Sequence, residues 1–563
     1  MKQKLTGIAL LVAGLFCTST YLPTTALAQT TSISKEERQK QAQEFDKASQ
    51  AAIEKKDFLR GAELAIKAHQ LESINGTFAY NAACAYSLAG KTDLAFEWLE
   101  KSLKAGYTNL EHVKTDSDLN ALHDDLRWAS YLGRVKEAAK VAAALWDSEA
   151  WKTPYADQLS EEERVAGLSK FWAEVKYNFV FTDTLKKLDW DAVYLKYLPR
   201  VKAAASTAEY YRILMEMCAL LQDGHTNVSP PEKLYGSEFT VPPFRTRLIE
   251  GKVIVTDVAD TSLSEQDIVR GVEITRVDGI DAKLWARKNV APYVSASTPQ
   301  DLDSRVFGAQ FLLGKKAEQP QVEFKDASGK TWTKAIERVT YGKRNQGIVR
   351  AGPFSWKMLD GNIAYVALNS FGDDTAAKEY LKNFPEISKA KAIIFDVREN
   401  GGGNSNVGYK VLSTLTDKAS ATSQSQTRDY KPSYRAWGRP DSNFDFNPWS
   451  FPAHGQYHFQ GKVIVLTSPR TYSAAEDFAV AFDVMKRGTI MGEATGGSTG
   501  QPLMFSLPGG GSARVCTKND TYPDGKAFIG VGIQPNIVVR PTLVDFRANR
   551  DTALEAALSH IKQ

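Results

Sequence analysis

The chain has few cysteines and histidines and no long run of apolar residues. Only 4 Cys occur among 563 residues, which excludes a fold built on disulfide bonds. With 7 His and no CxxC, HExxH or His-rich tract, the sequence indicates neither a metal site nor a cofactor. The 70 basic and 66 acidic residues nearly balance and form no Lys/Arg block, so nucleic acid is not an expected partner.

Residues 1–28 have the pattern of a secretory signal peptide. Lys2 and Lys4 precede a short apolar stretch, and Ala26-Leu27-Ala28 is an A-x-A cleavage site. The apolar stretch is too short to cross a membrane, and no other run approaches the roughly 20 residues that a span needs. A membrane anchor is the alternative to a cleaved leader. We expect a mature protein without a membrane span that is periplasmic or secreted.

Two helical regions are predicted in the first half of the chain. Residues 38–135 show helical spacing of apolar residues, and Gly61 and Ala95 lie 34 residues apart in similar segments. This stretch resembles a tetratricopeptide-like repeat, which would offer a groove to a peptide or a protein partner; a plain helical spacer is the alternative. Residues 158–236 form the second helical region, whose last helix stops at Asp223-Gly224.

Residues 237–340 are predicted to form a β domain. They contain β-branched runs, a turn at Asp278-Gly279 and a hairpin with Ser328-Gly329 at its tip. The segment IVRGVEITRVDGI resembles part of a PDZ domain, although the Gly-Leu-Gly-Phe loop that captures peptide carboxylates is not visible. We therefore expect a PDZ-like fold and leave its peptide binding open.

Residues 353–563 are predicted to be an α/β domain. Five apolar strands alternate with helices, a pattern that indicates a mostly parallel central sheet. Between residues 420 and 460 lies an insertion rich in aromatic residues and proline. A loop of this length is often a lid or a binding loop.

The segment KVIVLTSPRTYSAAEDFAVAF carries the sharpest chemical signal. An apolar strand runs into a short turn, and Ser473 stands where an amphipathic helix begins. Its hydroxyl would be held at the rim of the sheet, with the N–H of Ala474 at the positive helix end and suited to an oxyanion. A plain helix N-cap is the competing interpretation of Ser473.

Two further segments complete the candidate site. AIIFDVRENGGGNSNVG places three glycines after a buried strand, where backbone N–H groups can turn toward a ligand. These glycines suit an oxyanion hole or form a simple turn, whereas a P-loop is excluded because no Lys-Ser/Thr follows. In LLQDGHTNVSP, His225 follows a helix end and could take the proton of a serine hydroxyl. His454 and His458 are its rivals.

Five motifs in order resemble the C-terminal-processing (tail-specific) and tricorn-core serine peptidase family. They are GNIAYVALNSF, DVRENGGGNSN, TSPRTYSAAEDFA, GEATGGSTGQP and YPDGKAFIGVGIQPNIVV. The resemblance implies a multidomain α+β protein with a ClpP/crotonase-like catalytic core. It also implies that Ser473 is the nucleophile and that Ala474 and Gly402, or a glycine next to it, supply the oxyanion N–H groups.

The same resemblance bears on the general base. Processing peptidases use a lysine at the position where this chain has Ser498, so a Ser–Lys dyad is not expected. The tricorn-like branch uses a histidine, and the DGHT motif assigns that role to His225. Glu493 and Ser498 are the candidates for the group that orients His225, with Glu476 less favoured.

Three functions follow from these residues. The first is an exported serine endopeptidase acting on peptides or unfolded proteins. The second is a peptide-binding protein on a peptidase scaffold, motivated by the missing lysine and the missing acidic partner. The third is a small-molecule ester or amide hydrolase with a pocket enclosed by the 420–460 insertion. A hydrogen-bonding distance between His225 and Ser473, or a bridge through Ser498, separates the first from the second.

Overall fold

The computed structural model describes residues 33–563 except 259, 347, 349–350 and 447. The predicted signal peptide lies outside the described residues. The chain divides into two compact units, with the division between Trp146 and Asp147. The predicted α+β, multidomain class is confirmed, while the tetratricopeptide-like, PDZ-like and ClpP-like assignments remain predictions.

The first unit consists of helices that pack against their neighbours in sequence. They are α1 (Lys35–Glu54), α2 (Phe58–Leu71), α3 (Gly76–Leu88), α4 (Thr92–Lys104), the short α5 (Leu110–Thr115) and α6 (Leu126–Trp146). Three of them begin at residues 58, 92 and 126, which continues the 34-residue spacing seen in the sequence. Fully buried alanines at the contacts, such as Ala65, Ala83 and Ala95, allow the helices to approach closely.

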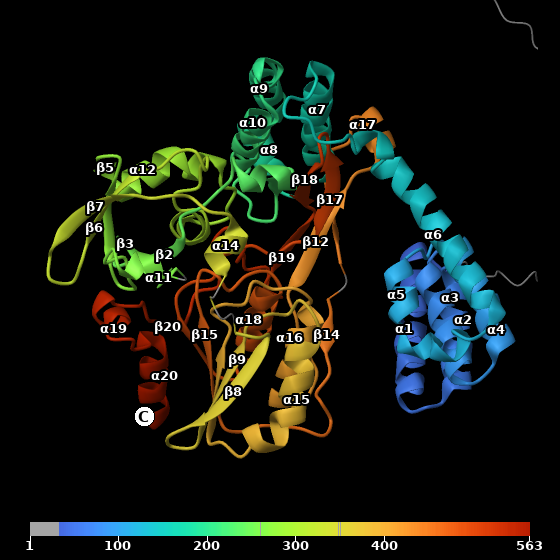
Figure 1. Ribbon diagram of the computed structural model, residues 1–563. Helices are drawn as coiled ribbons and strands as arrows, with labels where there is room; N and C mark the ends of the chain where they lie inside the picture. The colour runs from blue at the N-terminus through green and yellow to red at the C-terminus, as the bar shows by residue number, and fades with distance from the viewer. Residues whose placement is uncertain (1–32, 259, 347, 349–350, 447) are drawn as a thin grey trace, which may run out of the picture. The chain divides into compact units, whose positions relative to one another are not determined.

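A six-stranded sheet forms the centre of the second unit (Figure 1). Its order is β20 (Ile537–Val538), β16 (Thr489–Gly492), β15 (Lys462–Thr467), β10 (Ala392–Asp396), β9 (Ile363–Leu368) and β8 (Phe354–Leu359). All neighbouring pairs are parallel except β8 with β9, which confirms the predicted mostly parallel sheet. The apolar runs form these strands because both faces of the sheet are covered.

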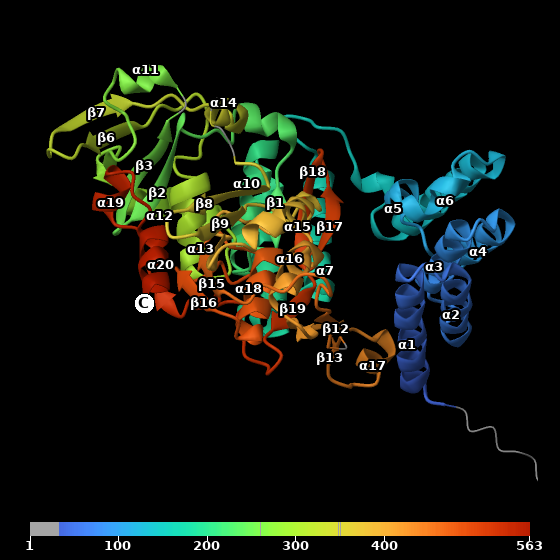
Figure 2. The same cartoon turned by 90° about the horizontal axis from the view of Figure 1, so that it is seen from below.

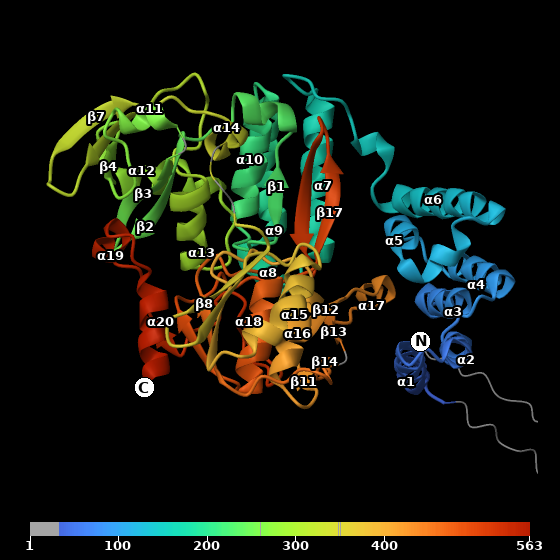
Figure 3. The ribbon, with the colours of Figure 1, turned by 60° about the horizontal axis from the view of Figure 1, so that its bottom comes forward.

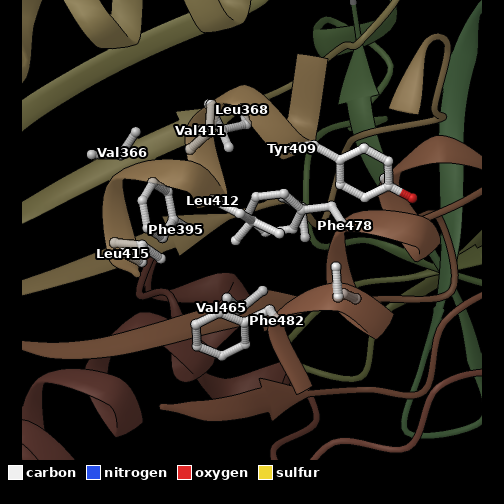
Figure 4. Packing of buried hydrophobic residues seen from close by; sticks show 14 of the residues in the cluster. Val366, Leu368, Phe395, Tyr409, Val411, Leu412, Leu415, Val465, Phe478 and Phe482 are labelled. Carbon is white, nitrogen blue, oxygen red and sulfur yellow. The ribbon is translucent and has the colours of Figure 1, made fainter. Parts of the chain in front are cut away.

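Helices cover the two faces of this sheet. On one face α15 (Thr375–Ile387), α16 (Ser405–Leu412) and α18 (Ala474–Met485) share one hydrophobic core with the strands. In that core Phe478 and Phe482 of α18 pack with Phe395 of β10 and Val465 of β15 (Figure 4). On the other face, α20 (Thr552–Lys562) covers a smaller cluster. The core fixes α18, and therefore Ser473 at its start, against the sheet.

The second helical region packs against a ribbon from the far end of the chain. Helices α7 (Glu161–Asn178), α8 (Thr182–Leu188), α9 (Trp190–Ala203) and α10 (Thr207–Ala219) share a core with β17 (Pro502–Leu507) and β18 (Gly511–Cys516). Figures 2 and 3 show this ribbon beside α7. The short β1 (Asn227–Ser229) pairs with β18. Because His225 stands just before β1, this pairing carries it to the catalytic domain.

Residues 244–335 form an antiparallel sheet of their own. Its path is β2 (Phe244–Ile249), β3 (Lys252–Val258), β4 (Glu273–Val277), β6 (Gln321–Lys325) and β7 (Thr331–Ala335), with the short β5 (Ile280–Asp281) beside β4. Asp278 and Gly279 both have positive φ, 51° and 77°, as a tight hairpin turn requires. The two predicted turns are confirmed, and α12 (Ala282–Asn289) packs on the same core.

The 420–460 insertion differs from the expected loop, because much of it is regular. It contains β11 (Ser420–Ala421), β12 (Gln424–Asp429), α17 (Pro432–Ala436), β13 (Ser442–Asp445) and β14 (Ser450–Phe451). Strand β12 pairs with β13 and also with β19 (Lys518–Thr521), which ties the insertion to the catalytic domain. These strands lack the alternation of apolar and polar residues that predicts a strand, so they were not expected. The described cysteines, Cys84, Cys218 and Cys516, are buried and unpaired.

Candidate active site

Ser473 lies in a strained turn between β15 and α18. Its φ of 55° and ψ of −125° are unfavourable for a residue with a side chain, and such strain is often found at functional sites. The residue is at the N-cap position of α18, as the simpler interpretation predicts. Its Oγ nevertheless lies 3.2 Å from Nε2 of His225, so the hydroxyl is also within reach of an imidazole.

His225 is held on both ring nitrogens. Its Nδ1 lies 2.8 Å from Oγ of Ser498, while Nε2 faces Ser473. The ring is 4% exposed and stacks on Tyr472, with ring centroids 5.0 Å apart. The three side chains come from segments 248 and 273 residues apart in sequence, which the fold brings together.

Glu476 fixes the loop that carries Ser498. Its buried carboxylate accepts hydrogen bonds from Thr495 Oγ1 at 2.5 Å, Gly497 N–H at 2.7 Å and Ser498 N–H at 2.9 Å. It also accepts one from the Ser473 N–H at 3.3 Å. Burial raises the Glu476 pKa to about 7. The acid therefore does not touch His225 but positions both residues that do.

Backbone N–H groups lie beside Ser473. The Cα of Gly402, with φ of 95°, packs so closely that a β-carbon there would come within 2.6 Å of the Ser473 Cβ. The Gly402 N–H donates to Asn400 Oδ1 at 2.9 Å. Within the described residues, the N–H groups of Ala474 and Gly403 have no acceptor. Ala474 and Gly403 are therefore the candidates for an oxyanion contact, and Gly403 is the neighbour of the glycine named first from the sequence.

The surroundings of His225 keep it neutral. Burial lowers its pKa to about 3, and the positive charges of Arg514, Arg305 and Lys518 act in the same direction. A neutral imidazole at neutral pH is the form that accepts a proton. The arrangement can therefore act as a base, although its imidazolium has no carboxylate partner on Nδ1.

The other predicted residues lie elsewhere. The carboxylate of Glu493 does not contact His225 and instead accepts from Arg247 Nη2 at 2.7 Å. His454 stacks on Tyr457, and His458 is exposed. Tyr472 and Asn400 were not predicted as site residues. The signal that could have indicated them is their position, since Tyr472 directly precedes Ser473 and Asn400 directly precedes the glycine run. In the described part of the chain, no group of three or more His, Cys, Asp or Glu could hold a metal ion.

Comparisons with known proteins show which families the chain is similar to. Residues 362–539 match the model of peptidase family S41, and residues 160–219 match that of the tricorn protease C1 domain. The chain is 23% identical over 417 residues to a carboxyl-terminal-processing protease of Picosynechococcus sp., covering 70% of this chain and 89% of that protein. It is also 23% identical to putative tricorn protease homolog 2 of Streptomyces coelicolor, covering 66% of this chain and 30% of that protein.

A solved structure shares the fold. The structure of mature CPAF complexed with lactacystin aligns with a TM-score of 0.57 at 14% identity, over 71% of this chain and 98% of that one. The resemblance found in the motifs is confirmed: residues 362–539 match peptidase family S41, and the chain is similar to proteins named carboxyl-terminal-processing protease. The prediction of a serine-type peptidase is confirmed at the level of this family. None of the helices in the described part of the chain has the length and hydrophobicity of a membrane span.

Proposed function

We propose that this chain, with its S41 domain, is an exported serine endopeptidase in which Ser473 is the nucleophile and His225 the general base. The observation that carries the proposal is the 3.2 Å separation of Ser473 Oγ and His225 Nε2. The 2.8 Å contact of Nδ1 with Ser498 supports it, because it fixes the ring in the orientation that this transfer needs.

In the proposed reaction, His225 carries the proton of Ser473 to the leaving amine. Nε2 of His225 takes the proton of Ser473 while Oγ forms a bond to the peptide carbonyl carbon. The negative charge on the carbonyl oxygen faces the N–H groups of Ala474 and Gly403 at the positive end of α18. When the C–N bond breaks, Nε2 returns the proton to the leaving amine. Water then repeats the same steps on the acyl ester and frees Ser473.

Ser498 and Glu476 take the place of an acidic partner. In the productive tautomer Nδ1 carries a proton and donates it in a hydrogen bond to Ser498 Oγ. Ser498 is neutral, so it orients the ring without balancing the imidazolium charge. Glu476 acts one step further away, by holding the Ser498 backbone.

We propose proteins or peptides as substrates, in line with the carboxyl-terminal-processing name of the first relatives. The leader pattern in residues 1–28 supports a periplasmic or secreted location. The helical unit is proposed as the place where a protein partner binds, because its helices repeat at the spacing typical of such surfaces.

A fluorophosphonate probe and a peptide library test the proposal together. Ser473→Ala should lose both covalent labelling and peptide cleavage, whereas Ser433→Ala, an exposed serine of α17, should keep both. Undiminished cleavage in Ser473→Ala would refute the assignment. Esters cleaved without any peptide cleavage would favour the small-molecule hydrolase, and neither reaction in the wild type would favour the binding protein.

A further inference from the structure

A cavity of 340 Å³ lies behind the turn that carries His225. Its walls come from α10, β1, β17 and β18 and from the segment 293–313. Neither Ser473 nor His225 lines it. The volume is in the range of sites that hold small molecules.

Two arginines supply the charge of this cavity. Arg305 and Arg514 both line it, whereas none of the described lining residues is acidic. Nε of Arg305 donates to Asp301 at 2.6 Å, and Asp301 does not line the cavity, so a part of the Arg305 charge is already balanced. Asp223 is also buried nearby, where Thr226 Oγ1 donates to it at 2.6 Å. Neither acid faces the cavity.

Arg514 is the less balanced of the two arginines. Its Nε donates to Asn227 Oδ1 at 2.8 Å and its Nη2 approaches the Gly224 carbonyl at 3.4 Å. Among the described residues it forms no ion pair. Its hydrogen bonds go only to neutral acceptors, while the charge of the buried Asp223 acts on it without a direct contact. An anion in the cavity would give the half-buried guanidinium the directly bonded partner that it lacks.

The other lining side chains are mixed: polar atoms make up more than half of the cavity's exposed surface, and apolar and aromatic side chains gather on part of the wall. Phe239, Tyr235 and Leu313 belong to it, together with Gln310, whose amide oxygen is buried without a hydrogen-bond partner in the described structure. That oxygen is itself closed off from the cavity, so it is not counted as a ligand contact. The cavity therefore combines a cationic end with apolar and aromatic side chains.

We propose that this cavity binds a small organic carboxylate bearing an apolar or aromatic group. The carboxylate lies against Arg514 and Arg305, where a guanidinium can donate two parallel hydrogen bonds. The apolar group lies against Phe239 and Leu313. An inorganic anion would leave this wall without a partner.

A bound anion would also change the pKa of the proposed catalytic histidine. Gly224, which the Arg514 guanidinium approaches, directly precedes His225. The two arginines also lower the pKa of His225, so an anion that neutralises them makes the imidazole more basic. This consequence depends on the proposed peptidase function, while the binding itself does not.

Calorimetry with phenylacetate on the mature full-length protein tests the site. We expect saturable binding of one molecule per chain, and binding at least tenfold weaker for phenylacetamide, which has the same shape without the charge. Arg514→Gln should weaken the binding of phenylacetate at least tenfold. Arg276→Gln, at an exposed site on β4, should leave the binding unchanged.

A second pair of variants avoids the buried residues. Met504 lines the cavity, is 60% exposed and stands opposite Arg514 in the β17–β18 register. The carboxylate introduced by Met504→Glu should pair with Arg514 and weaken the binding of phenylacetate tenfold. Met504→Gln, which adds no charge, should leave the binding unchanged. Equal binding of acid and amide, no binding of either, or the same affinity in Met504→Glu and Met504→Gln would overturn the proposal.

A competition experiment with the Ser473→Ala variant distinguishes two sources of the carboxylate: a peptide C-terminus and a free small acid. A tripeptide ending in Phe with a free C-terminus, but not its amide, should displace phenylacetate if the site takes chain ends. Displacement by neither peptide identifies a free small acid. Because these measurements read binding, their failure is separate from a failure of peptidase activity.

Discussion

The two units of the chain differ in whether they bury charged side chains. In the described part of residues 33–146 the buried polar side chains are all serines, namely Ser49, Ser87 and Ser102. The described part of the second unit buries eleven acidic, basic or histidine side chains, among them Asp223, His225, Glu476, Asp477 and Asp520. Burying such groups is costly unless each has partners. The comparison therefore locates the chemistry in the second unit.

The units also differ in how far their contacts reach. In the first, an ion pair such as Arg127 with Asp93 joins neighbouring helix pairs. In the second, Tyr211 donates to the Pro508 carbonyl at 2.6 Å across 297 residues, and Ser473 meets His225 across 248. Four predictions test whether function follows this division, from the largest effect to the smallest.

His225→Gln should break the second unit's chemistry while leaving its fold. We expect kcat/KM for peptide cleavage to fall by about 10⁴-fold, because glutamine cannot take the Ser473 proton. His458→Gln is the control, since that side chain is exposed. A variant that cleaves as fast as the wild type would show that the base lies elsewhere.

The buried histidine should also make the second unit sensitive to acid. The pKa of His225 is 6.5 when exposed and about 3 in the fold, so below pH 6.5 the unfolded chain binds a proton that the folded chain rejects. Stability present above pH 6.5 is therefore lost as the pH falls. This group should cost the wild type about 3 kcal/mol between pH 7.5 and pH 4.

Urea unfolding of the wild type and of His225→Gln at these two pH values measures this cost. Between pH 7.5 and pH 4, the wild type should lose more free energy of unfolding than the variant does. His458→Gln should show no such shift. A constant difference across the pH range would mean that the folded protein does protonate His225.

Ser498→Ala removes the only side-chain partner of His225 Nδ1 in the described structure. We expect kcat to fall by about 10- to 100-fold with little change in KM, because the ring loses its orientation but substrate contacts remain. Ser498→Thr keeps the hydroxyl and should recover most of the rate. If alanine and threonine behave alike, Ser498 is not a positioning residue.

Removal of the first unit should have the smallest effect. A chain of residues 147–563 is expected to cleave a short peptide within about twofold of the full-length rate, because Ser473, His225 and every residue that contacts them remain. Circular dichroism would verify that the shortened chain is folded. A folded protein with a tenfold lower rate would show that the units are coupled and the comparison is wrong.

The sequence predicted best what depends on local pattern. The strands around Phe395 and Val465 are continuous apolar runs between turn signals, and their order follows from the alternation with helices. The pairing of Ser473 with His225 followed from motif order, since few histidines compete. The strand pair of the 420–460 insertion was missed because its stabilising partner, β19, comes from residues 518–521.

The orienting group shows why some of the site stayed out of reach. Glu493 and Ser498 were equal candidates, and only the fold shows that Arg247, from the 244–335 sheet, takes the carboxylate of Glu493. Glu476 was less favoured from the sequence, although it matches an acidic position of the motif. It does accept from Ser473, but most of its hydrogen bonds go to a loop 19 to 22 residues away.

The three buried thiols give each unit its own reporter of opening. Cys84 lies in the core of the first unit, and Cys218 and Cys516 lie in a core of the second. Burial raises the pKa of all three thiols, so none is a reactive thiolate while its surroundings are closed. The rate at which each one is alkylated therefore measures how often its unit opens, and the first unit can be followed separately from the second in one intact chain.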